Sequence, residues 1–153
     1  MPSRALLDAV SRYLEPRRLA TCEIRTVPPR YRRIAVDAVL HLACGVDGAR
    51  VQARAREILD GYLDPLTGGA DRLGWPFGRA VYRGEILALL AGVPGVERVT
   101  SLRFRVGGNS RPRCDNVPLC ANELPRAGRH RLRIETETPS DLKRSEPHEC
   151  QSR

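Results

Sequence analysis

The stretch IAVDAVLHL, residues 34–42, decides the fold, because its apolar residues recur at every second position. An alternation with period two is typical of a β-strand with one buried face. The apolar set predicted to face the core is Ile34, Val36, Ala38, Leu40 and Leu42. The alternate positions are Ala35, Asp37, Val39 and His41, so the second face of this strand is mixed in character.

Two helices are predicted after this strand. Asp47 is a favourable N-cap residue, and the residues that follow it place apolar side chains on one helical face over about four turns. That apolar stripe consists of Val51, Ala55, Ile58, Leu59, Tyr62 and Leu63. A second helix is predicted over residues 79–91 and ends at Gly92 and Pro94. Its apolar face is expected to comprise Tyr82, Ile86, Leu89 and Leu90.

Three more strands and a further helix complete the expected elements. Period-two alternation predicts strands over residues 21–27, 99–106 and 130–136. A helix over residues 5–14 has Ser3 as its cap and ends before Pro16. We therefore expect an α+β fold, a small two-layer domain with a sheet of about four strands covered by two helices. The expected divisions are an N-terminal helix and connector (1–20), the α+β domain (21–136) and a disordered C-terminal tail (137–153).

Composition limits the class of protein. The chain has 153 residues, of which 41% are hydrophobic and 29% charged, which is enough apolar material for one core. Neither a membrane span nor a secretory signal is predicted, because no apolar run is long enough and no cleavage pattern is present. We expect a cytoplasmic protein. Five cysteines in such a chain favour reduced thiols over a disulfide framework.

The formal net charge is +8, and Lys143 is the one lysine among 26 basic residues. A basic surplus is compatible with an arginine-rich nucleic-acid-binding domain. The near-total preference for arginine looks more like a coding bias of a GC-rich genome. The basic segment of Arg30, Arg32 and Arg33 around Tyr31 is better explained as a solvated hairpin or a subunit contact than as a stacking platform.

A zinc site is the most enzyme-like alternative. Its weak candidate ligands are Cys114, Cys120 and His130, with His148 and Cys150 further on. Structural zinc sites present close pairs such as C-x2-C, whereas Cys114 and Cys120 are separated by five residues. We therefore expect no metal, no cofactor and no catalytic residue, and a small zinc-supported interaction domain stays an alternative. His41 is expected to be a surface or interface residue.

The segment between the two central helices, residues 65–78, combines glycine and proline with large apolar side chains. Leaving such side chains in water forfeits on the order of 2 kcal/mol each. We therefore expect Leu66, Leu73, Trp75 and Phe77 to fold back onto the domain.

The run YLDPLTGGADRLGWPFG, residues 62–78, followed by RAVYRGEILALLAGVPGVERVTSL, residues 79–102, resembles the C-terminal region of the baseplate J-like assembly proteins. These proteins occur in phage-tail-like contractile injection systems and are related to the wedge proteins of contractile phage tails. The residues that carry the resemblance are Leu63, Asp64, Pro65, Leu66, Thr67, Gly68, Gly69, Gly74, Trp75, Pro76, Phe77 and Gly78. Family members are usually several times longer, so the likeness concerns their last part.

The resemblance implies a structural, non-enzymatic role in the baseplate of an assembled particle in the cytoplasm. The implied partners are other baseplate subunits, namely wedge, hub or sheath-proximal proteins, and nucleic acid is not an expected partner. In the motif, glycines permit tight turns and Pro76 stiffens the path, while Trp75 and Phe77 supply apolar area. Whether Trp75 belongs to the core or anchors a partner stays open at this point.

Overall fold

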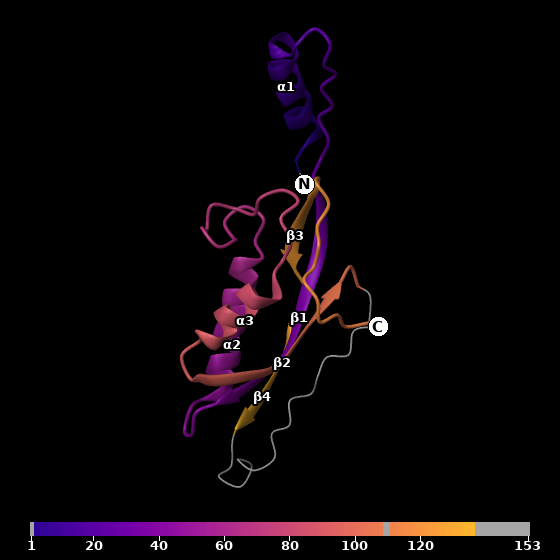
Figure 1. The fold of residues 1–153 in the computed structure, drawn as a ribbon. Coiled ribbons are helices and arrows are strands. Elements are labelled where there is room, and N and C mark those ends of the chain that lie inside the picture. Colours follow the sequence, from indigo (N-terminus) through magenta and orange to yellow (C-terminus); the bar gives the residue numbers. More distant parts are fainter. Residues whose placement is uncertain (1, 109–110, 137–153) are drawn as a thin grey trace. The chain divides into compact units, whose positions relative to one another are not determined.

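The computed structural model describes residues 2–108 and 111–136, and the fold class predicted from the sequence is confirmed. The elements are α1 (Arg4–Leu14), the short 3-10 helix η1 (Glu15–Arg17), β1 (Arg30–Leu42), α2 (Gly48–Tyr62), α3 (Arg83–Ala91), β2 (Val96–Val106), β3 (Glu123–Ala127) and β4 (Arg131–Thr136) (Figure 1). The predicted disordered tail lies outside the described residues.

Two compact units divide the chain between Arg30 and Tyr31. In the N-terminal unit, α1 begins where it was predicted, because the Ser3 hydroxyl accepts a hydrogen bond from the Leu6 amide at 3.2 Å. The strand predicted over residues 21–27 is wrong, since this segment has no regular secondary structure. Residues 21–30 group with α1 rather than with the expected α+β domain.

The C-terminal unit is built on β1, which pairs with every other strand of the sheet. β2 lies antiparallel on one edge of β1, from Ile34 opposite Val106 to Leu42 opposite Val96. β3 and β4 follow one another along the other edge, and β4 runs parallel to β1 (Figure 1). The sheet therefore depends on one long strand that is hydrogen-bonded on both sides.

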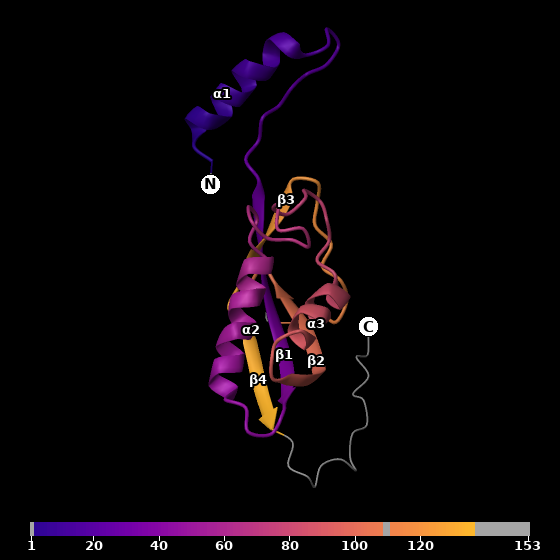
Figure 2. The ribbon, with the colours of Figure 1, turned by 90° about the vertical axis from the view of Figure 1, so that its left-hand side faces the viewer.

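Helices α2 and α3 cover one face of this sheet (Figure 2). The predicted inner face of β1 is buried throughout, and it packs with apolar residues of both helices. The helical contributions that are buried are Val51, Ala55, Leu59 and Tyr62 from α2 and Ile86 and Leu90 from α3. The Asp47 carboxylate caps α2 by accepting from the amides of Ala49 and Arg50 at 2.9 and 3.3 Å.

Helix α3 is shorter than predicted. It begins at Arg83 instead of residue 79, because Val81 is extended and exchanges two backbone hydrogen bonds of 2.9 Å with Val117. Tyr82, predicted to lie on the buried face, is exposed. Strand β3 was missed altogether, since its five residues include Pro125 and show no simple alternation.

The connection between β3 and β4 contains a buried histidine, His130. Nδ1 of His130 accepts a hydrogen bond from the Val36 amide at 2.9 Å, so the ring is held with its proton on Nε2. Nε2 lies 3.2 Å from a carboxylate oxygen of Asp60 without forming a hydrogen bond. Burial lowers the pKa of His130, and the nearby Asp60 carboxylate opposes this shift.

We predict that the free energy of unfolding falls as the pH drops below about 6.5, the ordinary histidine pKa. Below that pH the unfolded chain takes up a proton that folded His130 does not, so the unfolded state is favoured. Urea denaturation on either side of this pH measures the effect. The variant His130→Gln cannot titrate and should show a smaller pH dependence. An equal pH dependence in both proteins would show that other groups are responsible.

Candidate functional site

The residues that carry the family resemblance form the connection from α2 to α3, and residues 63–78 are called the motif loop here. The loop starts with a turn organised by Asp64. Its carboxylate oxygen Oδ1 accepts from the amides of Leu66 and Thr67 at 2.8 Å and from the Thr67 hydroxyl at 3.0 Å. These hydrogen bonds, with that of the Thr67 amide the largest, lower the pKa of Asp64. The segment Asp-Pro-Leu-Thr is thus a side-chain-stabilised turn.

Glycines then let the backbone close on itself. The Gly69 amide donates to the Tyr62 carbonyl at 2.9 Å, and Gly69 has a φ of 81°, a conformation that L side chains rarely adopt. At the far side of the loop, the amides of Gly74 and Trp75 donate to the carbonyls of Gly68 and Pro65 at 3.1 and 3.0 Å. The two halves of the motif are therefore hydrogen-bonded to each other.

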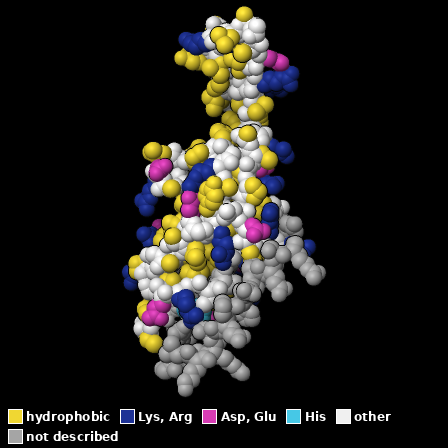
Figure 3. Space-filling view, viewed as in Figure 1, with side chains coloured by type: hydrophobic (Ala, Val, Ile, Leu, Met, Phe, Trp, Pro, Cys, Tyr) yellow, Lys and Arg dark blue, Asp and Glu magenta, His cyan; other side chains and the backbone are white. Residues whose placement is uncertain are grey.

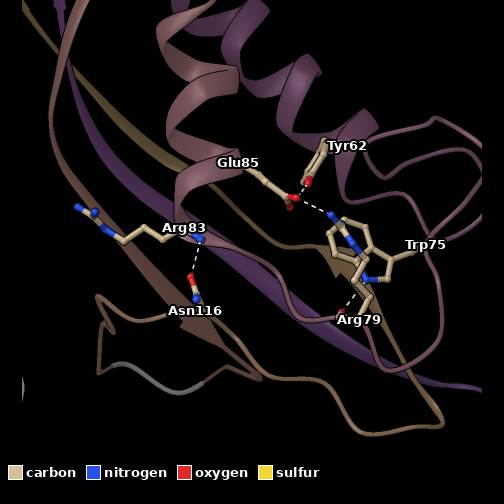
Figure 4. Close-up of polar contacts among 6 residues, drawn as sticks. All are labelled: Tyr62, Trp75, Arg79, Arg83, Glu85 and Asn116. Atoms are coloured by element: carbon tan, nitrogen blue, oxygen red, sulfur yellow. Dashed lines mark hydrogen bonds and ion pairs between the residues drawn. The ribbon is translucent and has the colours of Figure 1, made fainter.

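Trp75 is buried, with 4% of its surface exposed, as is Leu63 at the start of the loop. Its ring meets Tyr62 edge to face, with 5.4 Å between the centroids and 89° between the planes. Its indole N–H donates to the Arg79 carbonyl at 2.9 Å, and the Arg79 guanidinium lies 5.2 Å from the ring centroid (Figure 4). The structure therefore places Trp75 in the core.

A carboxylate links these groups to α3. The Tyr62 hydroxyl donates to one oxygen of Glu85 at 2.5 Å, and the Arg79 guanidinium donates to the other (Figure 4). Burial, with the Glu85 hydrogen bond as the next cause, raises the pKa of Tyr62 to about 12, so the phenol stays neutral. Both oxygens of Glu85 are engaged, so this cluster is equipped to hold α2, α3 and the motif loop together.

The start of α3 depends on a residue far away in the sequence. No side chain of the preceding segment caps the helix, and the Arg83 amide donates to the side chain of Asn116 at 2.9 Å (Figure 4). Sequence reasoning missed Asn116, Arg79 and Glu85. Glu85 could have been recognised from the sequence, because a carboxylate in the first turn of a helix is favourable. No local pattern marks Asn116 as a cap.

Three other apolar side chains of the motif loop, those of Leu66, Leu73 and Phe77, point to solvent, which corrects the prediction that they fold back. The exposed fraction is 77% for Leu66, 88% for Leu73 and 60% for Phe77. Turn geometry and the buried Trp75 fix the loop, so these three side chains are not needed to hold it. In the space-filling view, hydrophobic side chains stand out over the loop and the helical layer (Figure 3).

A groove of about 820 Å³ adjoins the loop between α2 and α3. Apolar and charged side chains both line it, among them Arg54, Ile58, Arg72, Glu85 and Leu89. The groove therefore presents both apolar area and charge, which is the composition of many protein–protein interfaces.

The weak zinc candidates do not come together. Cys120 is exposed, His130 is buried with Nδ1 occupied by the Val36 amide, and Cys114 is disulfide-bonded. The expectation of reduced thiols is therefore wrong for Cys114, because cysteine spacing alone does not reveal a pairing. Within residues 2–108 and 111–136, no group of three or more side chains could hold a metal ion. His148 and Cys150 lie outside the described residues.

The remaining sequence candidates have ordinary surroundings. Tyr31 packs partly against the core, and Arg32 lies 3.6 Å from a carboxylate oxygen of Glu123. His41 is near the surface, 2.9 Å from the Thr100 hydroxyl and 3.4 Å from a Glu135 oxygen. None of the helices in the described part of the chain is long and apolar enough to cross a membrane.

Comparison with protein-family models and with characterised proteins finds no match to this sequence. The interpretation of the motif loop therefore rests on its residues and their geometry.

We predict that Trp75→Ala lowers the free energy of unfolding by about 3–5 kcal/mol, the range for emptying a large buried aromatic site. Phe77→Ala is the matched control in the same loop, and its effect should stay within about 0.5 kcal/mol because the ring is mostly exposed. Chemical denaturation of both variants measures the difference. Equal losses would contradict the assignment of Trp75 as the anchor of the loop.

A second pair of variants tests the backbone of the motif. A Cβ atom at Gly68 would collide with the carbonyl oxygens of Tyr62 and Asp64, so Gly68→Ala should destabilise the protein by about 1–3 kcal/mol. A Cβ atom at Gly61 meets nothing within 4 Å, so Gly61→Ala in α2 should stabilise it by up to about 1 kcal/mol. Thermal unfolding compares the two. A stable Gly68→Ala variant would rule out the tight turn described above.

Proposed function

We propose that this chain is a structural component of the baseplate of a contractile injection system or phage-tail-like particle, and that it acts through protein–protein contacts. The proposal rests on one observation: the motif loop is fixed by its own turns and by Trp75, yet it exposes Leu66, Leu73 and Phe77. A fixed loop with apolar side chains suits a docking surface, because little conformational entropy is lost when it binds.

The polar groups beside the loop favour a contact role over catalysis. Tyr62 is a neutral phenol, and Glu85 accepts from Tyr62 and Arg79 at its two oxygens. A general base or nucleophile has to be directed at a substrate, whereas each oxygen of this carboxylate is directed at a group of the protein itself, the Tyr62 hydroxyl or the Arg79 guanidinium. We therefore propose no enzymatic activity for the loop.

The proposed partners are other baseplate subunits, namely wedge, hub or sheath-proximal proteins, and the proposed location is an assembled particle in the cytoplasm. On the side of this chain, the contact would be made by the exposed residues of the motif loop and the neighbouring groove between α2 and α3. Leucine and phenylalanine side chains that become buried in such a contact would contribute to its binding energy through the apolar area removed from water.

Co-expression with the tail proteins of the same particle tests this proposal. We predict that the chain co-purifies with at least one baseplate subunit, and that the triple variant Leu66→Ser, Leu73→Ser, Phe77→Ser loses at least about tenfold in affinity without a change in melting temperature. The control Leu19→Ser, Val27→Ser removes exposed apolar side chains from the N-terminal unit.

Two results would contradict the proposal. Failure to co-purify with any tail protein would remove the proposed function itself. Equal binding by the parent and the triple variant, or equal loss in the triple variant and the control, would show that the motif loop is not the contact surface.

A further inference from the structure

The face of the sheet opposite α2 and α3 carries a cluster of arginines on its strands. The outward residues of β1 are the alternate positions that the sequence marked as mixed, and Asp37 and Val39 are central among them. In the register of the sheet, Asp37 lies between Arg103 of β2 and Arg131 of β4. At the next outward position of β1, two residues after Asp37, Val39 lies between Ser101 and Arg133. Neighbouring strands are about 4.8 Å apart, so these side chains form a compact two-row patch.

The negative charge within this patch is already neutralised. Arg105 donates to both oxygens of Asp37, with Nε to Oδ2 at 2.8 Å and Nη2 to Oδ1 at 2.7 Å. This bidentate pair raises the pKa of Arg105 and holds the Asp37 carboxylate in a fixed position. Because Asp37 is already paired with Arg105, it does not neutralise the positive charge of the other arginines on this face.

Arg103, Arg131 and Arg133 are exposed, and among the described residues their side chains have no hydrogen-bond or ion-pair partner. They surround a depression of about 300 Å³ in the sheet face. Its lining consists of these three arginines together with Asp37, Ala38, Val39, Ser101 and Pro112. We call this surface the arginine face.

We propose that the arginine face binds an extended acidic segment of a partner protein. Arg131 and Arg133 are two residues apart on one strand, so they repeat at about 6.6 Å, the same repeat as alternate side chains of an extended peptide. Each guanidinium can pair with a carboxylate through two parallel hydrogen bonds. Val39 gives the floor of the depression an apolar contact for the side of the segment.

The composition of the face favours carboxylates on a protein over a nucleic acid. No aromatic side chain lines the depression, so it lacks the stacking platform of single-strand binders. Three arginines could neutralise about three phosphates, fewer than the roughly 6–10 phosphate contacts of a strong nucleic-acid binder. Glu135, exposed two residues beyond Arg133 on the same β4 face, ends the run of positive charge on this strand, so the face suits a short acidic segment rather than a continuous phosphate backbone.

This surface is separate from the motif loop, and the proposal holds whether or not the chain belongs to a baseplate. The test uses the full chain and three fluorescent probes: a short peptide with glutamate at alternate positions, the same peptide with glutamine, and single-stranded oligothymidylate. The face variant is Arg131→Gln, Arg133→Gln. The control Arg50→Gln, Arg56→Gln removes the same charge from exposed positions of α2.

Fluorescence anisotropy at physiological salt should show binding of the glutamate peptide and at least about tenfold weaker binding of the glutamine peptide. The face variant should lose at least about tenfold in affinity for the glutamate peptide, and the control should keep it. No binding of the glutamate peptide, or an equal loss in the face variant and the control, would overturn the proposal. Tighter binding of the oligonucleotide, lost in the face variant, would also overturn it and assign the face to nucleic acid.

Discussion

Burial of the inner face of β1 is the constraint on which the rest of the C-terminal unit depends. This strand pairs with β2, β3 and β4, and its inner residues pack against α2 and α3. Because side chains alternate strictly along a strand, a slip of one residue would bring Asp37 and His41 into the core and expose Leu40. The same alternation that fixes the register therefore places the polar positions of β1 on the outer face, between the arginines of β2 and β4.

The two proposed contact surfaces lie in different layers of this unit and have different chemistry. The motif loop closes the helical layer through Trp75, which joins the end of α2 to the segment before α3 by an aromatic contact and an indole hydrogen bond. Its outward side chains are apolar. The sheet layer presents charge on strands that β1 holds in register. Both surfaces owe their shape to buried residues, so a partner would meet side chains that are already positioned.

Much of this fold was predictable because the deciding signals are local. The alternation over residues 34–42 and the caps Ser3 and Asp47 act on their own neighbours, and the structure contains each of them. The predicted strand over 21–27 is wrong because alternation alone does not form a strand. The segment also needs a neighbouring strand to pair with and a core against which its apolar face can pack. β3 was missed because it is short, contains Pro125 and is defined by pairing with β1.

The candidate site was predictable in its position and not in its details. The glycine and proline pattern marked the motif loop, but transfer energies alone suggested that all its large apolar residues are buried. The outcome differs between Trp75 and its neighbours because only Trp75 has both a ring partner and a hydrogen-bond acceptor. The cap from Asn116 and the role of Arg79 arise from contacts between distant segments, which no local pattern encodes.

Amide hydrogen exchange in the motif loop of the purified protein tests the central claim most directly, since that claim requires the loop to be rigid before any partner binds. We expect the amides of Gly69, Gly74 and Trp75, which donate to loop and helix carbonyls, to exchange nearly as slowly as those of α2. Exchange of these three amides at the rate of an unfolded chain would contradict that claim.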